Sequence, residues 1–235
     1  MPRTDNNTSP VLAADPGLAP VNTLPGVGPV LEAALERIGI TRVQDLWFHL
    51  PLRYEDRTRL TPISELRIGE SAQVEGTIEA VERGFRFRPQ LRVVISDDTR
   101  TMLTWRFFSF RRAQVDQLPP GARLRCYGQI RHGAHGPEIV HPQYQRLSGE
   151  GSGIEETLTP VYPVTEGLGQ KRIAGLITHA LRKLPADATL ELIPENLRIH
   201  LRLLSLREAL LLVHRPPAGA DVASLVLGIH PAQQR

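Results

Sequence analysis

The sequence predicts an α+β protein that is mainly β: a five-stranded Greek-key barrel of the OB type, flanked by an amino-terminal helical hairpin and by carboxyl-terminal helices. Residues 71–145 alternate polar and apolar side chains with period two, whereas the stretches on either side repeat apolar residues at helical spacing. Turn residues divide the alternating region into five short strands, a count and spacing typical of OB barrels. A five-stranded SH3-like barrel is the structural alternative.

Residues 1–22 predict a flexible lead-in, because Pro, Ala, Asn and Asp occur there without periodicity. Residues 23–65 predict a helical hairpin. Its first helix begins at Pro29, ends at Gly39 and buries a stripe made of Leu31, Ala34, Leu35 and Ile38. We expect Thr41 to cap a second helix that Pro51 ends, with Val43, Leu46, Trp47 and Leu50 on its apolar face. The Gly-Val-Gly turn before the hairpin either offers backbone amides to a phosphate or packs the helices closely, and both readings stay open.

Residues 66–150 predict the barrel domain. Its strands are expected in the runs "SAQVEGTIEAVE", "QLRVVISD", "TMLTWRFF", "ARLRCYGQI" and "GPEIVHPQY". Residues 151–215 predict an extended strap and helices, one of which starts near Leu168 and another of which carries a capping box made of Ser205 and Glu208. Residues 216–235 predict a connection to a further domain.

Charge is unevenly distributed along the chain. The formal net charge is +3, but the stretch from Arg83 to Arg131 holds eleven arginines against Asp97, Asp98 and Asp116, so 11 − 3 = +8. Such a concentration favours an anionic partner, first of all nucleic acid, although an arginine-rich solvated surface is the alternative. The only cysteine, Cys126, excludes an intrachain disulfide and a four-thiolate zinc site, and we expect it in the core. No apolar run is long enough to span a membrane, so we expect a cytoplasmic monomer that does not bind membranes.

The run "TWRFFSFRR" joins aromatic and basic side chains at the end of the third expected strand. If Phe107 points into the barrel, alternation turns Arg106 and Phe108 outward. An exposed phenylalanine flanked by guanidinium groups can stack on a base while the cations bind phosphates. The candidate nucleic-acid-binding residues here are Arg106, Phe108, Phe110, Arg111 and Arg112. The alternative is that Phe108 and Phe110 pack under a neighbouring helix.

The turn between the first two strands repeats this chemistry in Phe85, Arg86, Phe87 and Arg88. In OB barrels that loop and the face of strands two and three commonly bind oligonucleotides. A merely solvated hairpin tip is the alternative.

The chain contains, in this order, the motifs "LPGVGP", "HLPLRYEDRT", "LTPISELRIGE", "RFFSF", "YGQI", "EIVHPQY" and "LTPVYPVTEGLGQK". Together they resemble the amino-terminal region of the RecG family of bacterial ATP-dependent DNA helicases, in a match that runs from about Leu24 to His214. The resemblance implies a wedge domain that separates strands at forks and Holliday junctions in DNA repair and recombination, with Phe108 stacking on the first unpaired base. The family can carry a second aromatic shortly afterwards; here Arg111 and Arg112 occupy that neighbourhood, unless Phe110 substitutes. The resemblance also implies action at the bacterial nucleoid and a contact with single-stranded DNA-binding protein.

No sequence feature predicts catalysis by this chain. It lacks the G-x-x-x-x-G-K-[ST] pattern that binds nucleotide phosphates, so we expect no cofactor here and assign ATP and Mg²⁺ to the longer family protein. His132 and His135 stand in a glycine-rich turn without thiols or acids nearby, which favours solvation over metal binding. Two other functions stay open: a general binder of single-stranded nucleic acid, and a protein-interaction barrel that accepts an acidic peptide tail.

Overall fold

The computed structural model describes residues 15–84, 89–147 and 153–221, which form two compact units. One unit combines the described residues up to Arg53 with Pro160–His214, and the other combines Tyr54–Thr159 with Arg215–Ala220. The two helical segments expected on either side of the barrel therefore belong to a single unit. The barrel unit also includes residues 54–65, which the sequence analysis had placed in the helical hairpin region.

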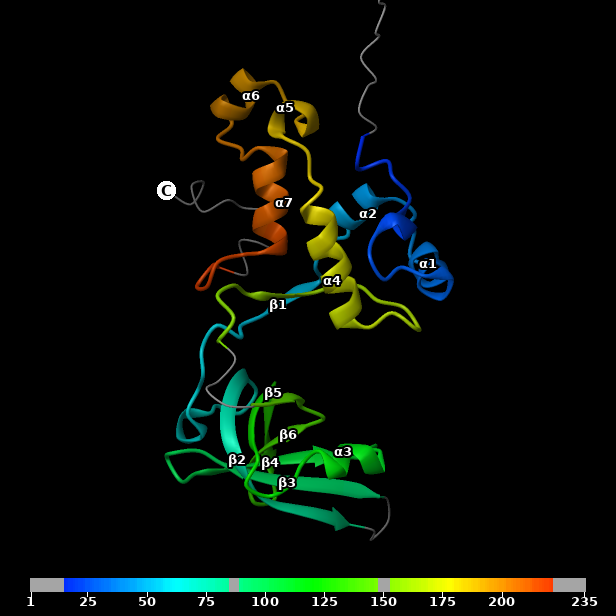
Figure 1. Cartoon of the computed structure of the whole chain (residues 1–235). Helices are drawn as coiled ribbons and strands as arrows, with labels where there is room; N and C mark the ends of the chain where they lie inside the picture. The colour runs from blue at the N-terminus through cyan, green and yellow to red at the C-terminus, as the bar shows by residue number, and fades with distance from the viewer. Residues whose placement is uncertain (1–14, 85–88, 148–152, 222–235) are drawn as a thin grey trace, which may run out of the picture. The chain divides into compact units, whose positions relative to one another are not determined.

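The strands of the barrel unit occupy the expected runs (Figure 1). They are β2 (Ser71–Gly84), β3 (Gln90–Ser96), β4 (Met102–Phe107), β5 (Arg123–Gly133), β6 (Gly136–Val140) and β7 (Gln143–Arg146). Their order in the sheet is β2-β3-β4-β6-β5-β7, and β2 also pairs with β5. That pairing closes the ring β2-β3-β4-β6-β5, in which only β4 and β6 run parallel. Five strands thus form the closed Greek-key barrel, as predicted, and β7 adds a sixth strand to the sheet.

The fifth expected strand is in fact two strands. A continuous run from 136 to 144 was predicted, but β6 stops at Val140 and β7 starts at Gln143. His141 between them has a φ of +50°, a left-handed conformation that does not fit a β-strand. Pro142 has no N–H to donate to a neighbouring strand. Because of this interruption, the chain separates from β4 after β6, and β7 then pairs with the first half of β5.

Alternation along β4 divides its side chains as expected. Leu103, Trp105 and Phe107 are buried, whereas Thr104 and Arg106 are only partly covered. The buried side chains join an apolar core that β2, β3, β5 and β6 complete with Val74, Ile78, Leu91, Val93, Ile95, Leu124, Cys126, Ile130 and Ile139. Burial raises the pKa of the Cys126 thiol to about 12, so this cysteine is a core residue.

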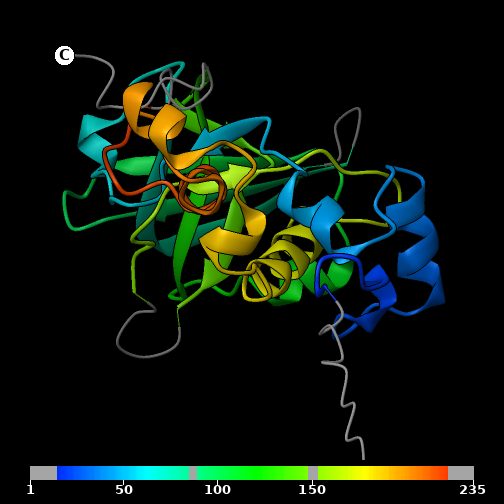
Figure 2. The ribbon, with the colours of Figure 1, turned by 90° about the horizontal axis from the view of Figure 1, so that it is seen from above.

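The helical unit contains α1 (Pro29–Glu36), α2 (Val43–Trp47), α4 (Gln170–Leu181), α5 (Asp187–Leu190), α6 (Glu195–His200) and α7 (Leu206–His214). Helices α2 and α4 lie side by side, as Figures 1 and 2 show from two directions. The Trp47 indole N–H donates to the Ala180 carbonyl over 2.8 Å and joins the two helices. The expected apolar stripe of α1 meets the apolar side chains of α4 in one core.

The predicted helix ends are partly correct. Gly39 follows α1 with a φ of +79°, a conformation that favours glycine. The capping box of α7 forms as predicted: the backbone N–H of Ser205 donates to the Glu208 carboxylate, and the Glu208 N–H donates to the Ser205 hydroxyl. The Thr41 cap was wrong, because α2 starts after Arg42.

The Asp45 carboxylate takes the place of the expected threonine cap. It accepts the backbone N–H groups of both Thr41 and Arg42. Helix α2 also ends at Trp47 rather than at Pro51, which leaves Leu50 exposed. Helices α5 and α6 were not predicted.

Short elements complete the description. They are the 3-10 turns at Val21–Thr23 and Ile63–Glu65, the helix α3 (Arg112–Asp116), and the strands β1 (Arg53–Glu55) and β8 (Thr159–Val161), which pair with each other. Strand β8 lies in the proline-containing segment expected as an extended strap, and α3 lies in the connection between β4 and β5.

A candidate nucleic-acid interface at the end of strand β4

The end of β4 opens into a hollow of about 510 Å³ on the barrel unit. Residues from both segments that the sequence singled out line it: Arg83 and Pro89 from the β2–β3 hairpin, and Phe108, Ser109, Phe110 and Arg112 from the segment after β4. Antiparallel pairing of β3 with β4 brings these segments together, because Leu91 near the start of β3 faces Phe107 at the end of β4. The lining combines two aromatic rings with two guanidinium groups, the combination that single-stranded nucleic acid requires.

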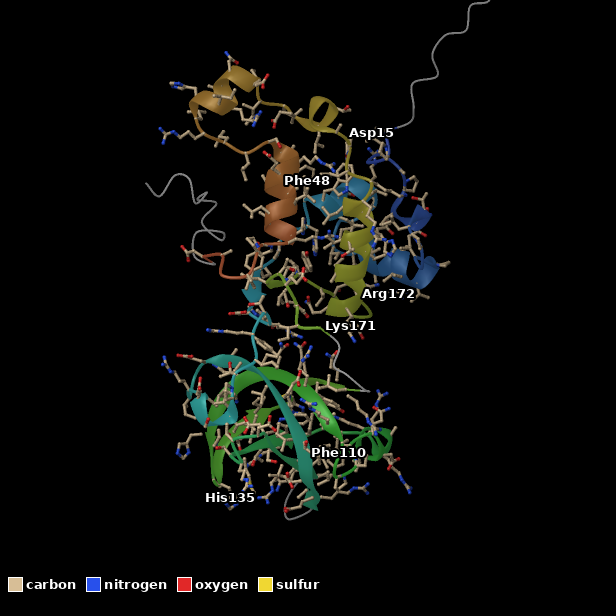
Figure 3. All side chains as sticks on the ribbon, turned by 60° about the vertical axis from the view of Figure 1, so that its left-hand side comes forward. Asp15, Phe48, Phe110, His135, Lys171 and Arg172 are labelled. Atoms are coloured by element: carbon tan, nitrogen blue, oxygen red, sulfur yellow. The ribbon has the colours of Figure 1, made fainter. Side chains whose placement is uncertain are left out.

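The phenylalanines around this hollow have different environments. Phe107 is 3% exposed and belongs to the barrel core, whereas Phe108 is 52% exposed. Phe110, labelled in Figure 3, is half-buried and packs against the core. It therefore offers less of its ring than Phe108 does. Of the three, Phe108 has the largest ring surface available for a ligand. The alternation argument predicted this difference between Phe107 and Phe108.

His141 is a neighbour of Phe108 that the sequence analysis missed. Its Nε2 accepts the backbone N–H of Phe108 over 3.3 Å, and its ring centroid lies 6.0 Å from that of Phe108. The centroid of the buried Phe107 ring lies 5.7 Å from it, nearly edge-on at 83°. The sequence signal was faint: a histidine followed by proline inside a run that otherwise reads as one strand.

Part of the predicted positive charge is neutralised by carboxylates. Arg106 pairs with Glu138 at 2.8 Å and Arg92 with Glu82 at 3.0 Å. Arg123 and the buried Arg125 both pair with Glu75, at 3.3 and 2.6 Å. The sum of +8 omitted Glu75, Glu82 and Glu138, because all three lie just outside the stretch that was counted. Arg106 is therefore less available to a phosphate than its outward direction suggested.

Other cations at this end remain accessible. Arg111 and Arg112 are exposed at the start of α3. Within the described ranges, the ion pairs of the barrel strands join other arginines to carboxylates and do not involve Arg83, Arg111 or Arg112. Cations at a helix amino terminus do not stabilise the helix, so helix stability does not explain this pair of arginines. Phe85, Arg86, Phe87 and Arg88, predicted as part of the same interface, lie outside the residues that the structure describes.

Comparison with known proteins assigns the chain to a family. The RecG wedge domain family matches residues 20–184. The chain belongs to that family. ATP-dependent DNA helicase RecG of Pasteurella multocida is 43% identical to it over 217 residues, which are 92% of this chain and 31% of that protein. RecG of Escherichia coli K12 is also 43% identical, over 92% of this chain and 31% of its own length, and RecG of Acidithiobacillus ferridurans is 36% identical. The chain thus spans about a third of these relatives.

A solved structure of RecG bound to a three-way DNA junction confirms the fold. It covers 88% of this chain and 28% of its own chain, with a TM-score of 0.67 and 24% sequence identity. The prediction of an OB-type barrel with flanking helices, made from the RecG resemblance and from the strand pattern, is correct.

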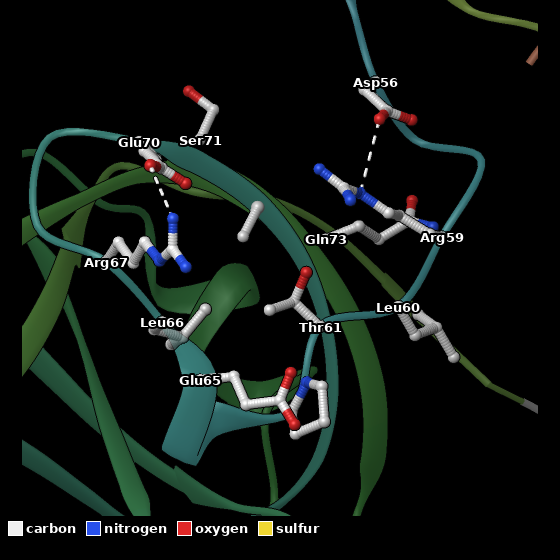
Figure 4. A pocket seen from close by; sticks show the side chains of 12 residues that line it. Asp56, Arg59, Leu60, Thr61, Glu65, Leu66, Arg67, Glu70, Ser71 and Gln73 are labelled. Atoms are coloured by element: carbon white, nitrogen blue, oxygen red, sulfur yellow. Dashed lines mark ion pairs between the residues drawn. The ribbon is translucent and has the colours of Figure 1, made fainter. Parts of the chain in front are cut away.

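Two further hollows on the barrel unit of this RecG wedge chain differ in chemistry from the one beside Phe108. One, of about 280 Å³, is lined by polar and aliphatic residues between Asp56 and Gln73 and crossed by the exposed ion pairs Arg59–Asp56 and Arg67–Glu70 (Figure 4). Its lining contains no aromatic ring on which a base could stack.

The other hollow, of about 490 Å³, is acidic. Four carboxylates line it, those of Glu75, Glu79, Asp97 and Asp98, against the single guanidinium of Arg123. A polyanion is repelled there. Among the three, only the hollow beside Phe108 suits DNA.

The histidine and acidic side chains of the described residues do not gather into a metal site. No group of three or more His, Cys, Asp or Glu side chains within residues 15–84, 89–147 and 153–221 is arranged to hold a metal ion. His132 and His135 are exposed at the β5–β6 turn. No helix in the described part of the chain is both long and apolar enough to cross a membrane.

Proposed function

We propose that this chain is the DNA-binding wedge module of a helicase that acts on branched DNA in repair and recombination. The observation that carries the proposal is the exposed ring of Phe108 in a hollow that Arg83 and Arg112 also line. Membership of the RecG wedge family, and a relative whose structure was solved on a three-way DNA junction, support forks and Holliday junctions as the targets.

The aromatic and basic residues of the hollow have different roles in this proposal. Phe108 stacks on the first unpaired base at the branch point and so resists re-annealing of the strands. Arg83, Arg111 and Arg112 neutralise phosphates on either side of that base, and Phe110 supports the floor of the hollow. Stacking on one aromatic ring contributes about 1–3 kcal/mol and does not depend strongly on the base. The wedge therefore acts on any sequence.

The energy for strand separation comes, in this proposal, from elsewhere. The relatives are ATP-dependent helicases about three times as long as this chain. We assign ATP and Mg²⁺ to the part of those proteins that this chain does not span, and we propose that the chain itself hydrolyses no nucleotide. DNA-stimulated ATP turnover by the purified chain would contradict this assignment.

Binding to four DNA substrates tests the proposal. Fork, Holliday junction, duplex and single-stranded DNA of matched length are titrated with the purified chain at two salt concentrations, with light scattering to check that it is a monomer. We expect tighter binding to the fork and the junction than to either linear form, and weaker binding to all four at the higher salt. Equal affinity for branched and linear single-stranded DNA would instead indicate a general single-strand binder.

The same hollow could accept an acidic peptide through its arginines. A peptide with the acidic tail of single-stranded DNA-binding protein is therefore added to the chain–fork complex. Displacement of the fork by micromolar peptide, without any effect of Phe108→Ala on fork binding, would identify a protein-interaction barrel instead of a wedge.

A further inference from the structure

Phe108 lies just beyond the part of β4 that the barrel holds in place. The regular pairing of β4 with β3 ends at Phe107, and its parallel pairing with β6 ends at Arg106 opposite Val140. The next backbone N–H, that of Phe108, has no partner strand. Without another contact, the Phe108 backbone would be held only through the buried Phe107 before it and the half-buried Phe110 after it, and ordering the exposed ring on DNA would cost conformational entropy.

His141, the residue that follows the neighbouring strand β6, supplies that contact. Its own backbone N–H donates to the Arg106 carbonyl over 2.9 Å, which extends the β4–β6 ladder by one residue. Its Nε2 then accepts the N–H of Phe108 over 3.3 Å. Because a backbone N–H can only donate, Nε2 is the acceptor in this hydrogen bond. One residue therefore holds β4 on both sides of Phe107.

The imidazole also contacts the two rings that differ most in exposure. It lies 5.7 Å from the buried Phe107 ring and 6.0 Å from the exposed Phe108 ring, tilted by 60° to the latter. Phe107 is held in the core. His141 contacts both rings, so it links the orientation of the exposed Phe108 ring to that of the buried Phe107 ring. Its backbone has a φ of +50°, which non-glycine residues rarely adopt and which persists where the surroundings hold it.

We propose that His141 is a positioning residue for Phe108: its imidazole fixes the backbone and the ring of Phe108 in the orientation that stacks on the branch-point base. This inference rests on the proposed role of Phe108 and adds a second residue to it. His141 itself need not touch DNA, so its effect on binding should depend entirely on the presence of the Phe108 ring.

A double-mutant cycle with the full 235-residue chain tests this dependence. The variants are His141→Asn, Phe108→Ala and the double substitution. The ligand is a fork with 2-aminopurine as its first unpaired base, whose fluorescence is quenched by stacking. Asparagine tolerates a positive φ, and its shorter side chain removes the ring and does not reach the position of the Nε2 acceptor, so the change has little backbone cost. His141→Phe, which keeps a ring but no acceptor, is the second variant in case His141→Asn melts early. His135→Asn, at an exposed histidine of the same domain, is the matched control.

We expect His141→Asn to weaken fork binding about threefold to tenfold, the range given by one hydrogen bond of ordinary net strength. The 2-aminopurine should brighten toward its level in Phe108→Ala. In the Phe108→Ala background the same change should cost nothing further. His141→Phe should show a loss of fork affinity as well, and His135→Asn none.

Three results would overturn the inference in distinguishable ways. Additive losses in the double variant would show that His141 contacts DNA independently. Unchanged binding and fluorescence in both His141 variants, with a clear loss in Phe108→Ala, would remove the positioning role but leave the wedge. Unchanged binding in Phe108→Ala would remove the wedge and the positioning role together.

Discussion

Strand β4 ends beside Phe108, Phe110 and Arg112, whereas the turn that precedes it carries Asp97 and Asp98. One end of the β3–β4 hairpin therefore offers rings and guanidinium groups in a hollow, and the other end offers a hollow of similar size lined by carboxylates. The six residues of β4 separate them by about 20 Å. At physiological salt the screening length is about 8 Å, so the electrostatic interaction between a DNA phosphate at one end and the carboxylates at the other end is largely screened. A single hairpin thus presents two independent surfaces of different chemistry, and the proposed DNA site uses only the aromatic one.

The largest expected effect separates core from surface at the aromatic end. Phe107→Ala should lower the free energy of unfolding by about 3–5 kcal/mol, because it leaves a cavity beside Trp105 and Tyr144. Phe108→Ala, one residue along, should change it by less than about 0.5 kcal/mol because that ring is mostly exposed. Urea unfolding of both variants measures the difference, and equal losses would mean that Phe108 is a core residue.

The next effect contrasts the two ends of β4 directly. Phe108→Ala should weaken fork binding by about 1–3 kcal/mol, the contribution of one stacked base. Met102 is an equally exposed apolar residue at the acidic end of the same strand, which makes Met102→Ala the matched control. Fluorescence anisotropy with a labelled fork measures both. A comparable loss in the two variants would show that exposed apolar surface in general, rather than the aromatic end, holds the fork.

A smaller effect concerns charge. Replacing Arg83 and Arg112 together with glutamine should flatten the plot of log affinity against log salt by about 1.8 for duplex-bearing substrates, at about 0.9 for each phosphate that the protein no longer neutralises. Arg123→Gln, at the acidic hollow and already paired with Glu75, should leave the slope nearly unchanged. A slope that changes in Arg123→Gln but not in the variant of Arg83 and Arg112 would place the phosphates at the acidic end of the hairpin, against the proposal.

The smallest effect is expected at the acidic end itself. Asp98 is exposed there and about 20 Å from the proposed phosphate positions, so Asp98→Asn should change fork affinity by less than about twofold at 0.15 M salt. Asp97 is unsuitable for this test because its carboxylate accepts the backbone N–H groups of Ile63 and Thr99. A tenfold gain in Asp98→Asn would show that DNA reaches both ends.

The sequence predicted the barrel well because its strands are half-buried, and period-two alternation reports which face is covered. Strands β3 and β4 carry that pattern along their whole length, and it also separated Phe107 from Phe108. What alternation cannot report is the identity of the neighbour across a ladder. Arg106 faces outward as expected, yet Glu138 on β6, 32 residues later, neutralises it, and only the parallel pairing of β4 and β6 brings the two together.

His141 was missed for a related reason. Its effect depends on a positive φ and on a hydrogen bond to a residue 33 positions earlier, and neither leaves a periodic signal. The caps were predicted only where the residue that precedes the helix is of the commonest capping type. Ser205 with Glu208 fits that rule, whereas Asp45, which accepts the N–H groups before α2 from inside the helix, does not.

The closed ladder around β4 also has a mechanical consequence. β4 is paired along both edges, through six residue pairs with β3 and three with β6, and the β2–β5 pairing leaves the ring without a free edge there. A load applied to Phe108 along the strand axis therefore acts on these hydrogen bonds in shear and is shared among them, whereas a load across the strand would break them one at a time. One step of DNA stacking is worth only about 1.4 kcal/mol on average. When a duplex is pulled against this strand end, the base pairs should yield well before the barrel deforms.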